Sequence, residues 1–155
     1  MSNASSLPIL SMQPGETRAG RPRLMSLGRV LALSGGPFAT PGWPAKNLHT
    51  DMDAARAAGL ATIVVSGTQW EGHMVGLLVD TVGPGWFVGG TIDIKLPRSV
   101  KVDETLTPRL TLTGFEDRAG RRTALFDVAV TNDNGDEVLV GTASAPVPSG
   151  SAAWP

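Results

Sequence analysis

The stretch Ser66-Gly67-Thr68-Gln69-Trp70-Glu71-Gly72-His73-Met74-Val75-Gly76-Leu77-Leu78-Val79-Asp80-Thr81 decides the fold of this chain. Its large apolar side chains recur three and four residues apart, which is the spacing of one helix face: Trp70, Met74, Leu77 and Leu78. Ser66 followed by Gln69 matches a capping box at the helix start. Because this is the most apolar helix that the sequence predicts, we expect a buried central helix over 67–81.

After this helix the apolar residues change to a period of two. Ile92, Ile94 and Leu96 alternate with polar residues, and three further apolar runs follow at 106–112, 124–130 and 138–143. The segment Asn132-Asp133-Asn134-Gly135-Asp136 predicts a hairpin turn, because Asn-Gly tolerates positive φ. Four strands joined by short turns predict an antiparallel sheet with one face wrapped around the helix, which is an α+β fold.

The region before the helix contains weaker signals. We predict a first strand over 26–33, followed by a loop over 34–44 with three prolines and three glycines. Thr50 is predicted to cap a short alanine-rich helix that ends at Gly59, with Asp51 and Asp53 in its first turn. A loop this long inside a compact domain is often functional.

Composition limits the possible classes. The 155 residues suit one domain, and the 19 glycines and 12 prolines exceed average usage. The absence of cysteine excludes a disulfide framework, a thiol nucleophile and a cysteine zinc site. A net charge of −1 gives no overall electrostatic footprint for nucleic acid or an anionic membrane, and no apolar run reaches the ~18–20 residues of a membrane span.

The turn-forming residues are concentrated partly at the two ends. We therefore predict a flexible arm over 1–24, a folded domain over 25–147 and a flexible tail over 148–155. Arg18, Arg21 and Arg23 in the arm indicate either a contact with a polyanion or a solvated tail.

The order of these elements, together with several local motifs, resembles the MaoC-like branch of the hotdog fold. The segment Lys46-Asn47-Leu48-His49-Thr50-Asp51 precedes the alanine-rich helix, as the family's D-x-N-P-x-H loop does. Val65-Ser66-Gly67 is similar to the family's segment at the start of the central helix, and 95–106 is similar to its basic strand with G-D-T-L. The resemblance covers about 26–147.

The resemblance implies a single hotdog domain and a set of site residues. His49 matches the catalytic His, and a His can give or take a proton near pH 7. Gly67 matches the residue whose N–H holds the thioester oxygen, where a helix N-terminus stabilises negative charge. The family's catalytic Asp lies five residues before the His, and Pro44 occupies that position here.

Other residues are candidates for the same site. Glu71 is the candidate second catalytic group, because some hotdog thioesterases use a carboxylate on this helix; a favourable charge near the helix N-terminus is its alternative role. The candidate substrate-binding residues are Asn47, Trp43, Ser66 and Trp70. Core packing is the alternative for the two tryptophans, and helix capping is the alternative for Ser66.

Three functions stay open at this point. The first is a hydro-lyase, a hydratase or dehydratase acting on an acyl-thioester carried by CoA or by a carrier protein. The second is a thioesterase using Glu71. The third is a non-catalytic hotdog subunit that binds a hydrophobic small molecule or supports a partner chain. The resemblance implies no metal and no redox cofactor, a homodimer with its pocket at the subunit interface, and a cytoplasmic protein without nucleic-acid or membrane partners.

Overall fold

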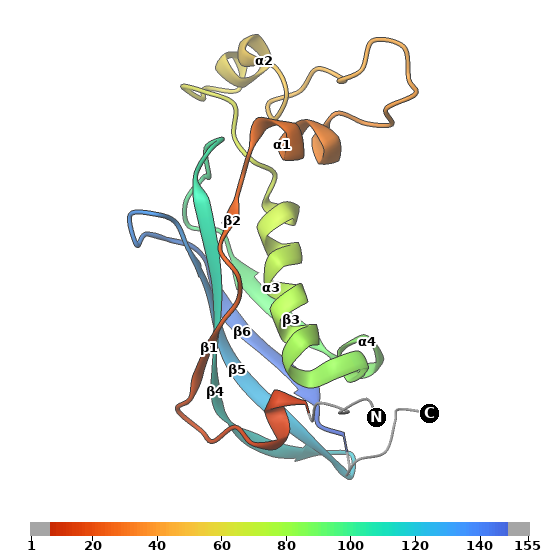
Figure 1. Ribbon diagram of the computed structural model, residues 1–155, viewed down its shortest axis with the longest axis vertical. Coiled ribbons are helices and arrows are strands. Elements are labelled where there is room, and N and C mark those ends of the chain that lie inside the picture. Colours follow the sequence, from red (N-terminus) through yellow and green to blue (C-terminus); the bar gives the residue numbers. More distant parts are fainter. Residues whose placement is uncertain (1–6, 149–155) are drawn as a thin grey trace, which may run out of the picture.

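The fold is a curved antiparallel sheet that wraps one long helix, as the computed structural model shows (Figure 1). The structure describes residues 7–148. The helical elements are η1 (Pro8–Leu10), α1 (Leu27–Ser34), α2 (Met52–Ala57), α3 (Gly67–Val82), η2 (Gly83–Gly85) and α4 (Trp86–Gly89). The strands are β1 (Thr17–Ala19), β2 (Arg23–Leu24), β3 (Thr91–Lys95), β4 (Thr105–Arg118), β5 (Arg121–Thr131) and β6 (Glu137–Pro146).

The sheet has the strand order β1-β4-β5-β6-β3, and β2 also pairs with β4. Every pairing is antiparallel. Leu110 lies opposite Val128 and Leu112 lies opposite Phe126, and all four side chains are buried. Side chains that face one another across a strand pair share one face of the sheet, so this row lines the concave face.

Helix α3 fills that concave face, as the sequence predicted. It begins at Gly67 and ends at Val82, one residue beyond the predicted end. Met74 and Leu78 are completely buried and belong to one core cluster with Leu110 and Phe126. The four predicted strands are also confirmed, because each alternating run forms one of the strands β3 to β6.

The predicted flexible arm over 1–24 is wrong from residue 7 onward. Ile9 and Met12 are buried in the core, and Thr17–Ala19 pairs with β4. Strands of two or three residues are too short to show the alternation that identifies a strand in a sequence. Residues 1–6 of the predicted arm and 149–155 of the predicted tail lie outside the described residues.

The predicted first strand over 26–33 is also wrong, because this segment forms helix α1. Val30 is its one fully buried side chain, whereas Leu27 and Leu33 are exposed. A helix of eight residues is too short to show its period clearly in the sequence, so its leucines suggested a buried strand. Leu, Ala and Arg are nevertheless good helix formers, which is the local preference that the structure follows.

Helix caps differ from the sequence prediction at two places. Asp51, not Thr50, caps α2, and its carboxylate accepts a hydrogen bond of 2.9 Å from the Ala54 N–H. Ser66 is the N-cap residue of α3 but forms no side-chain cap, because its hydroxyl pairs with that of Thr68. The predicted capping box of Ser66 and Gln69 is therefore absent.

Helix α1, the loop after it and α2 project beyond one end of the sheet, above the N-terminal end of α3 (Figure 1). This arrangement places the 35–51 segment at the end of the molecule where α3 begins. Within residues 7–148, no helix has the length and apolar character needed to cross a membrane.

Candidate functional site

His49 is held by its ring rather than left free in the loop. Its Nδ1 lies 2.7 Å from the carbonyl oxygen of Val64, and the side chain is half-buried. A carbonyl oxygen can only accept, so Nδ1 carries the proton and donates it. In the neutral ring this leaves the lone pair on Nε2, the form that a general base requires.

Asn47 fixes the backbone around His49. Its Oδ1 accepts a hydrogen bond of 2.8 Å from the His49 N–H, and its Nδ2 donates to the Ser34 carbonyl at 2.8 Å. The amide therefore connects the His49 loop to the end of α1. Both ends of the Asn47 side chain therefore bind backbone atoms of this region.

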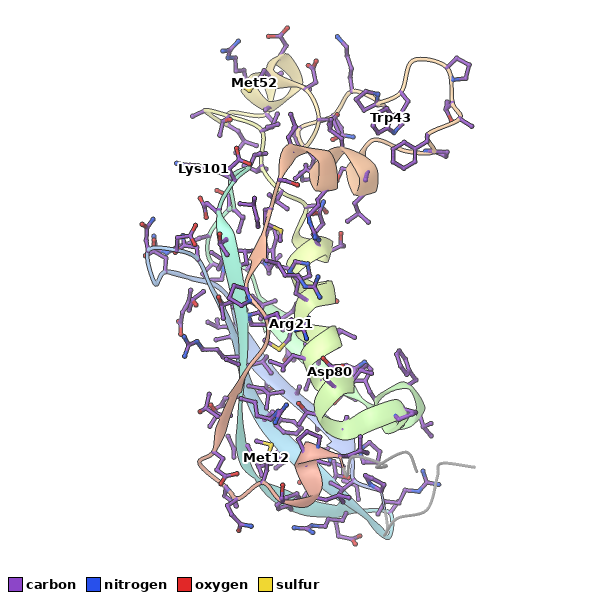
Figure 2. All side chains as sticks on the ribbon, in the orientation of Figure 1. Met12, Arg21, Trp43, Met52, Asp80 and Lys101 are labelled. Carbon is purple, nitrogen blue, oxygen red and sulfur yellow. The ribbon has the colours of Figure 1, made fainter. Side chains whose placement is uncertain are left out.

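The loop that precedes His49 is fastened at its base. Trp43 Nε1 donates to the Gly36 carbonyl at 3.0 Å, and the Ala45 N–H donates to the Gly35 carbonyl at 2.8 Å. The ring of Trp43 lies 4.7 Å from that of Phe38, centre to centre, and Trp43 lies on the inner side of the loop (Figure 2). Trp43 thus packs within its own loop.

Gly67 forms the first residue of α3, where backbone N–H groups have no partner inside the helix. A Cβ at this position would lie 2.5 Å from Leu96 Cδ1 and 3.9 Å from the Trp70 ring. In the observed conformation, a side chain at position 67 would displace the end of the exposed Leu96 side chain. An apolar wall therefore stands beside a helix N-terminus that can stabilise developing negative charge on an oxygen.

His49 and Gly67 are brought to the same end of the molecule by Val64. The Val64 carbonyl binds His49, and Val64 precedes Gly67 by three residues, which span at most about 11 Å. Two more backbone hydrogen bonds fix the segment between His49 and Gly67. The Val64 N–H donates to the Leu48 carbonyl, and the Val65 N–H donates to the Val100 carbonyl at 2.8 Å.

The remaining candidates have different surroundings. Glu71 lies on α3 about 6 Å along the axis from Gly67, half-buried, and forms no ion pair or hydrogen bond within the described part of the chain. Trp70 is 3% exposed and belongs to the core cluster, which agrees with its alternative role in packing. Ser66 uses its hydroxyl on Thr68, at 2.9 Å.

Asp51 serves the fold of the loop. Its pKa is lowered because its carboxylate accepts the Ala54 N–H, and the Lys46 ammonium 3.5 Å away adds to the effect. Asp51 is therefore a permanently charged cap rather than a proton donor near pH 7. Among residues 7–148, no group of three or more His, Asp or Glu side chains could hold a metal ion.

Sequence reasoning missed two features of this end of the molecule. The first is the Val64 carbonyl, which has no side-chain signal because it acts through the backbone. The second is the position of His73, whose pKa is lowered by burial and then by the charges of Arg23 and Arg29. Arg23 lies in the segment for which the sequence predicts a flexible arm, so nothing in the sequence connects it with α3.

Comparisons with known proteins define the fold. No protein-family model matches this chain, and no curated protein sequence matches it. Among solved structures, the chain is similar to a MaoC-like dehydratase from Rhodospirillum rubrum, with a TM-score of 0.70, 18% identity, and coverage of 92% of this chain and 97% of that one.

Two further solved structures agree. An (R)-hydratase from A. caviae involved in PHA biosynthesis gives a TM-score of 0.67 at 18% identity, covering 89% of this chain and 98% of that one. The HadBC complex, a 3R-hydroxyacyl-ACP dehydratase from Mycobacterium tuberculosis, gives a TM-score of 0.61 at 13% identity, covering 86% of this chain and 96% of that one. The chain therefore has the hotdog fold of the MaoC-like dehydratases and (R)-hydratases.

Proposed function

We propose that this protein is a hydro-lyase that adds water to, or removes it from, an acyl-thioester. The observation that supports the proposal is the hydrogen bond from His49 Nδ1 to the carbonyl of Val64, three residues before Gly67, because this bond leaves the Nε2 lone pair free to take a proton. The likeness to solved hydratases and dehydratases supports the same reaction class.

The proposed chemistry needs two groups of this chain. His49 Nε2 takes a proton from water, whose oxygen then bonds to the β-carbon of an enoyl-thioester. The double-bond electrons move toward the thioester, and the Gly67 N–H at the helix N-terminus stabilises the negative oxygen. The imidazolium then returns its proton to the α-carbon, which completes the addition of water.

This mechanism accommodates Pro44. A proline has no acidic group, so the family's Asp has no equivalent at that position. In the proposed sequence one imidazole both removes and returns the proton, so no second acid is required. We expect slower turnover than an enzyme with both groups would give.

The experiment is a hydration assay with short and medium enoyl-CoA substrates, run in both directions. We expect reversible water addition that falls at least 100-fold in His49→Ala, the range typical of general acid–base catalysis. His49→Gln is the matched variant, because an amide can replace the hydrogen bond to Val64 without moving a proton. Full activity in either variant would contradict the assignment of His49.

Glu71 supports a second candidate, thioester hydrolysis. Its carboxylate is half-buried one turn into α3 and forms no ion pair within the described residues. A thioesterase would release free thiol from acyl-CoA, and Glu71→Gln would abolish the release. Absence of thiol release from every acyl-CoA tested, alongside hydration activity, would exclude this candidate.

Pro44 supports a third candidate, a subunit that binds an acyl chain without turnover. Two of the similar solved structures are described as complexes, ChsH1-ChsH2 and HadBC. Binding of an acyl-CoA by calorimetry without hydration or thiol release would favour this role. Reversible hydration by the purified chain alone would exclude it.

We also propose a cytoplasmic homodimer with its pocket at the subunit interface. Strand β3 supports the dimer, because it pairs with β6 on one side and ends the sheet on the other. A second copy could extend the sheet at this edge. Light scattering at micromolar concentration should give twice the chain mass of 16.1 kDa, and a monomer would contradict the proposal.

A further inference from the structure

A basic cluster lies along one side of α3, away from Glu71. It consists of Arg23 on β2, Arg29 on α1, and Gln69 and His73 on α3, and we call it the Arg23 cluster. Gln69 and His73 are four residues apart, so they occupy the same side of the helix. Arg23 and Arg29 lie close enough for their charges to act on His73.

The strand pairing directs Arg23 toward α3. Arg23 lies opposite Leu106 in the β2–β4 register, and Leu106 is completely buried in the core that α3 fills. Opposite side chains share one face, so Arg23 also lies on this face. The preceding chain runs against α3, since a Cβ on Gly20 would lie 3.7 Å from Leu77 Cβ.

The cluster contains buried side-chain nitrogens without hydrogen-bond partners. The Gln69 Nε2 and His73 Nδ1 atoms are buried and have no hydrogen-bond partner among the described residues. A buried amide or imidazole nitrogen without a partner is destabilising, and a native structure rarely leaves one. An acceptor that entered the cluster would satisfy Gln69 Nε2, and would satisfy His73 Nδ1 when that nitrogen carries a proton.

The cluster also has no counter-charge. Within residues 7–148, the ion pairs involve Lys46, Arg56, Arg98 and Arg118, so Arg23 and Arg29 have no carboxylate within 4 Å. Glu71 lies about 160° around the helix from His73, at 100° per residue. Asp80 is exposed farther toward the C-terminal end of α3, whereas Arg21 lies in the segment between β1 and β2, beside the helix (Figure 2).

We propose that the Arg23 cluster binds the phosphate groups of a CoA thioester. The inference rests on the proposed function and names the carrier that this site would accept. Guanidinium groups and the Gln69 amide donate to phosphate oxygens, and His73 does so when Nδ1 carries a proton. The orphan nitrogens lie below the surface, which suits a small anion better than the flat acidic face of a carrier protein.

The position of the cluster agrees with this assignment. His73 is six residues beyond Gly67 on α3, about 9 Å along the helix axis. Six residues at 100° each also place His73 about 120° around α3 from Gly67, so a ligand that contacts both places must cross from one side of the helix to the next. In CoA these two groups are separated by the pantetheine arm, so one molecule can contact both places.

The test compares CoA with pantetheine, which lacks the phosphates, by calorimetry at low salt. We expect Arg23→Gln with Arg29→Gln to weaken CoA binding about tenfold or more and to leave pantetheine binding unchanged. Arg121→Gln is the matched control, because Arg121 is an exposed arginine in the β4–β5 hairpin at the opposite end of the sheet.

A second readout uses the two histidines of this chain, His49 and His73. Phosphate bound beside His73 should raise its pKa, measured from the imidazole proton signals, and this rise should be lost in the double arginine variant. Equal CoA binding by wild type and double variant would overturn the inference, as would tight, salt-dependent binding of an acidic carrier protein without CoA binding.

The outcomes separate this inference from the proposed function. Free CoA is not turned over, so its binding can be measured whether or not the protein is a hydratase. CoA binding that depends on the two arginines, together with no hydration of any substrate, would refute the proposed function and leave this inference standing. The opposite outcome is hydration in which the KM is the same for CoA thioesters and pantetheine thioesters, in both wild type and the double variant. That outcome would refute this inference and leave the proposed function standing.

Discussion

At the scale of single residues, Asn47 decides where His49 lies. Asn47→Ala removes the bond to the Ser34 carbonyl and the acceptor for the His49 N–H. We expect the free energy of unfolding to fall by about 1–3 kcal/mol and kcat to fall together with it. Asn47→Asp keeps the acceptor for His49 and loses the donor to Ser34, so it should retain more activity than Asn47→Ala. Urea unfolding and the hydration assay measure both effects, and equal activity in the two variants would contradict this role.

His73 should make stability depend on pH. Its pKa is lowered in the fold from its ordinary value of 6.5, first by burial and then by Arg23 and Arg29. The unfolded chain therefore binds this proton at higher pH than the folded chain does. The contribution of the neutral His73 ring to the free energy of unfolding is therefore complete above pH 6.5, and it is lost as the pH falls toward the lowered pKa.

The measurement for His73 is denaturant unfolding between pH 8 and pH 5. We expect the free energy of unfolding to fall less over this range in His73→Gln than in wild type, because Gln does not titrate. The carboxylates contribute equally to both proteins and cancel in the comparison. Parallel pH curves for the two proteins would show that His73 titrates alike in the folded and unfolded states.

The residues of the site were predictable to different degrees. His49 and Gly67 carry a local pattern, a His before a capped helix and a Gly at a helix start, and the structure brings both to one end of the molecule. Asn47 is adjacent to His49 in sequence, but its partner Ser34 is 13 residues away, across a loop whose path no local pattern specifies. The role of a side chain that contacts residues distant in the sequence can be seen only once the fold is known.

At the scale of elements, Gly35 fixes how the loop folds back on α1. A Cβ there would lie 2.5 Å from the Leu31 carbonyl oxygen and 2.8 Å from Pro44 Cβ. We expect Gly35→Ala to lower the free energy of unfolding by about 1–3 kcal/mol, since the backbone oxygen cannot move without disturbing the helix.

Gly28→Ala is the matched control for Gly35→Ala on the same helix. A Cβ at position 28 would meet no heavy atom within 4 Å, so Ala should stabilise α1 by about 0.5 kcal/mol. Thermal unfolding of the two variants measures the difference. A stable Gly35→Ala variant would mean that the loop can leave α1 at little cost.

Prediction of elements succeeded where a period extends over many residues. Helix α3 has 16 residues and the strands β4 to β6 have 10 to 14, long enough to show their periods. Helix α1 and strand β1 attach through few buried positions, so their patterns are set by contacts with β4 and the core rather than by their own sequence.

At the scale of the whole molecule, substitutions on the outer side of α3 can show which surface forms the proposed dimer interface. Gly72 and Gly76 lie on this side, and a Cβ on either would meet nothing within 4 Å in the single chain. We expect Gly72→Ala and Gly76→Ala each to raise the free energy of unfolding by about 0.5–1 kcal/mol, because Ala is the better helix former. If the second copy joins at the β3 edge, light scattering should still give a dimer for both variants. Dissociation of both variants into folded monomers would show instead that the partner packs on the bare side of α3 and that the dimer proposed through β3 is wrong.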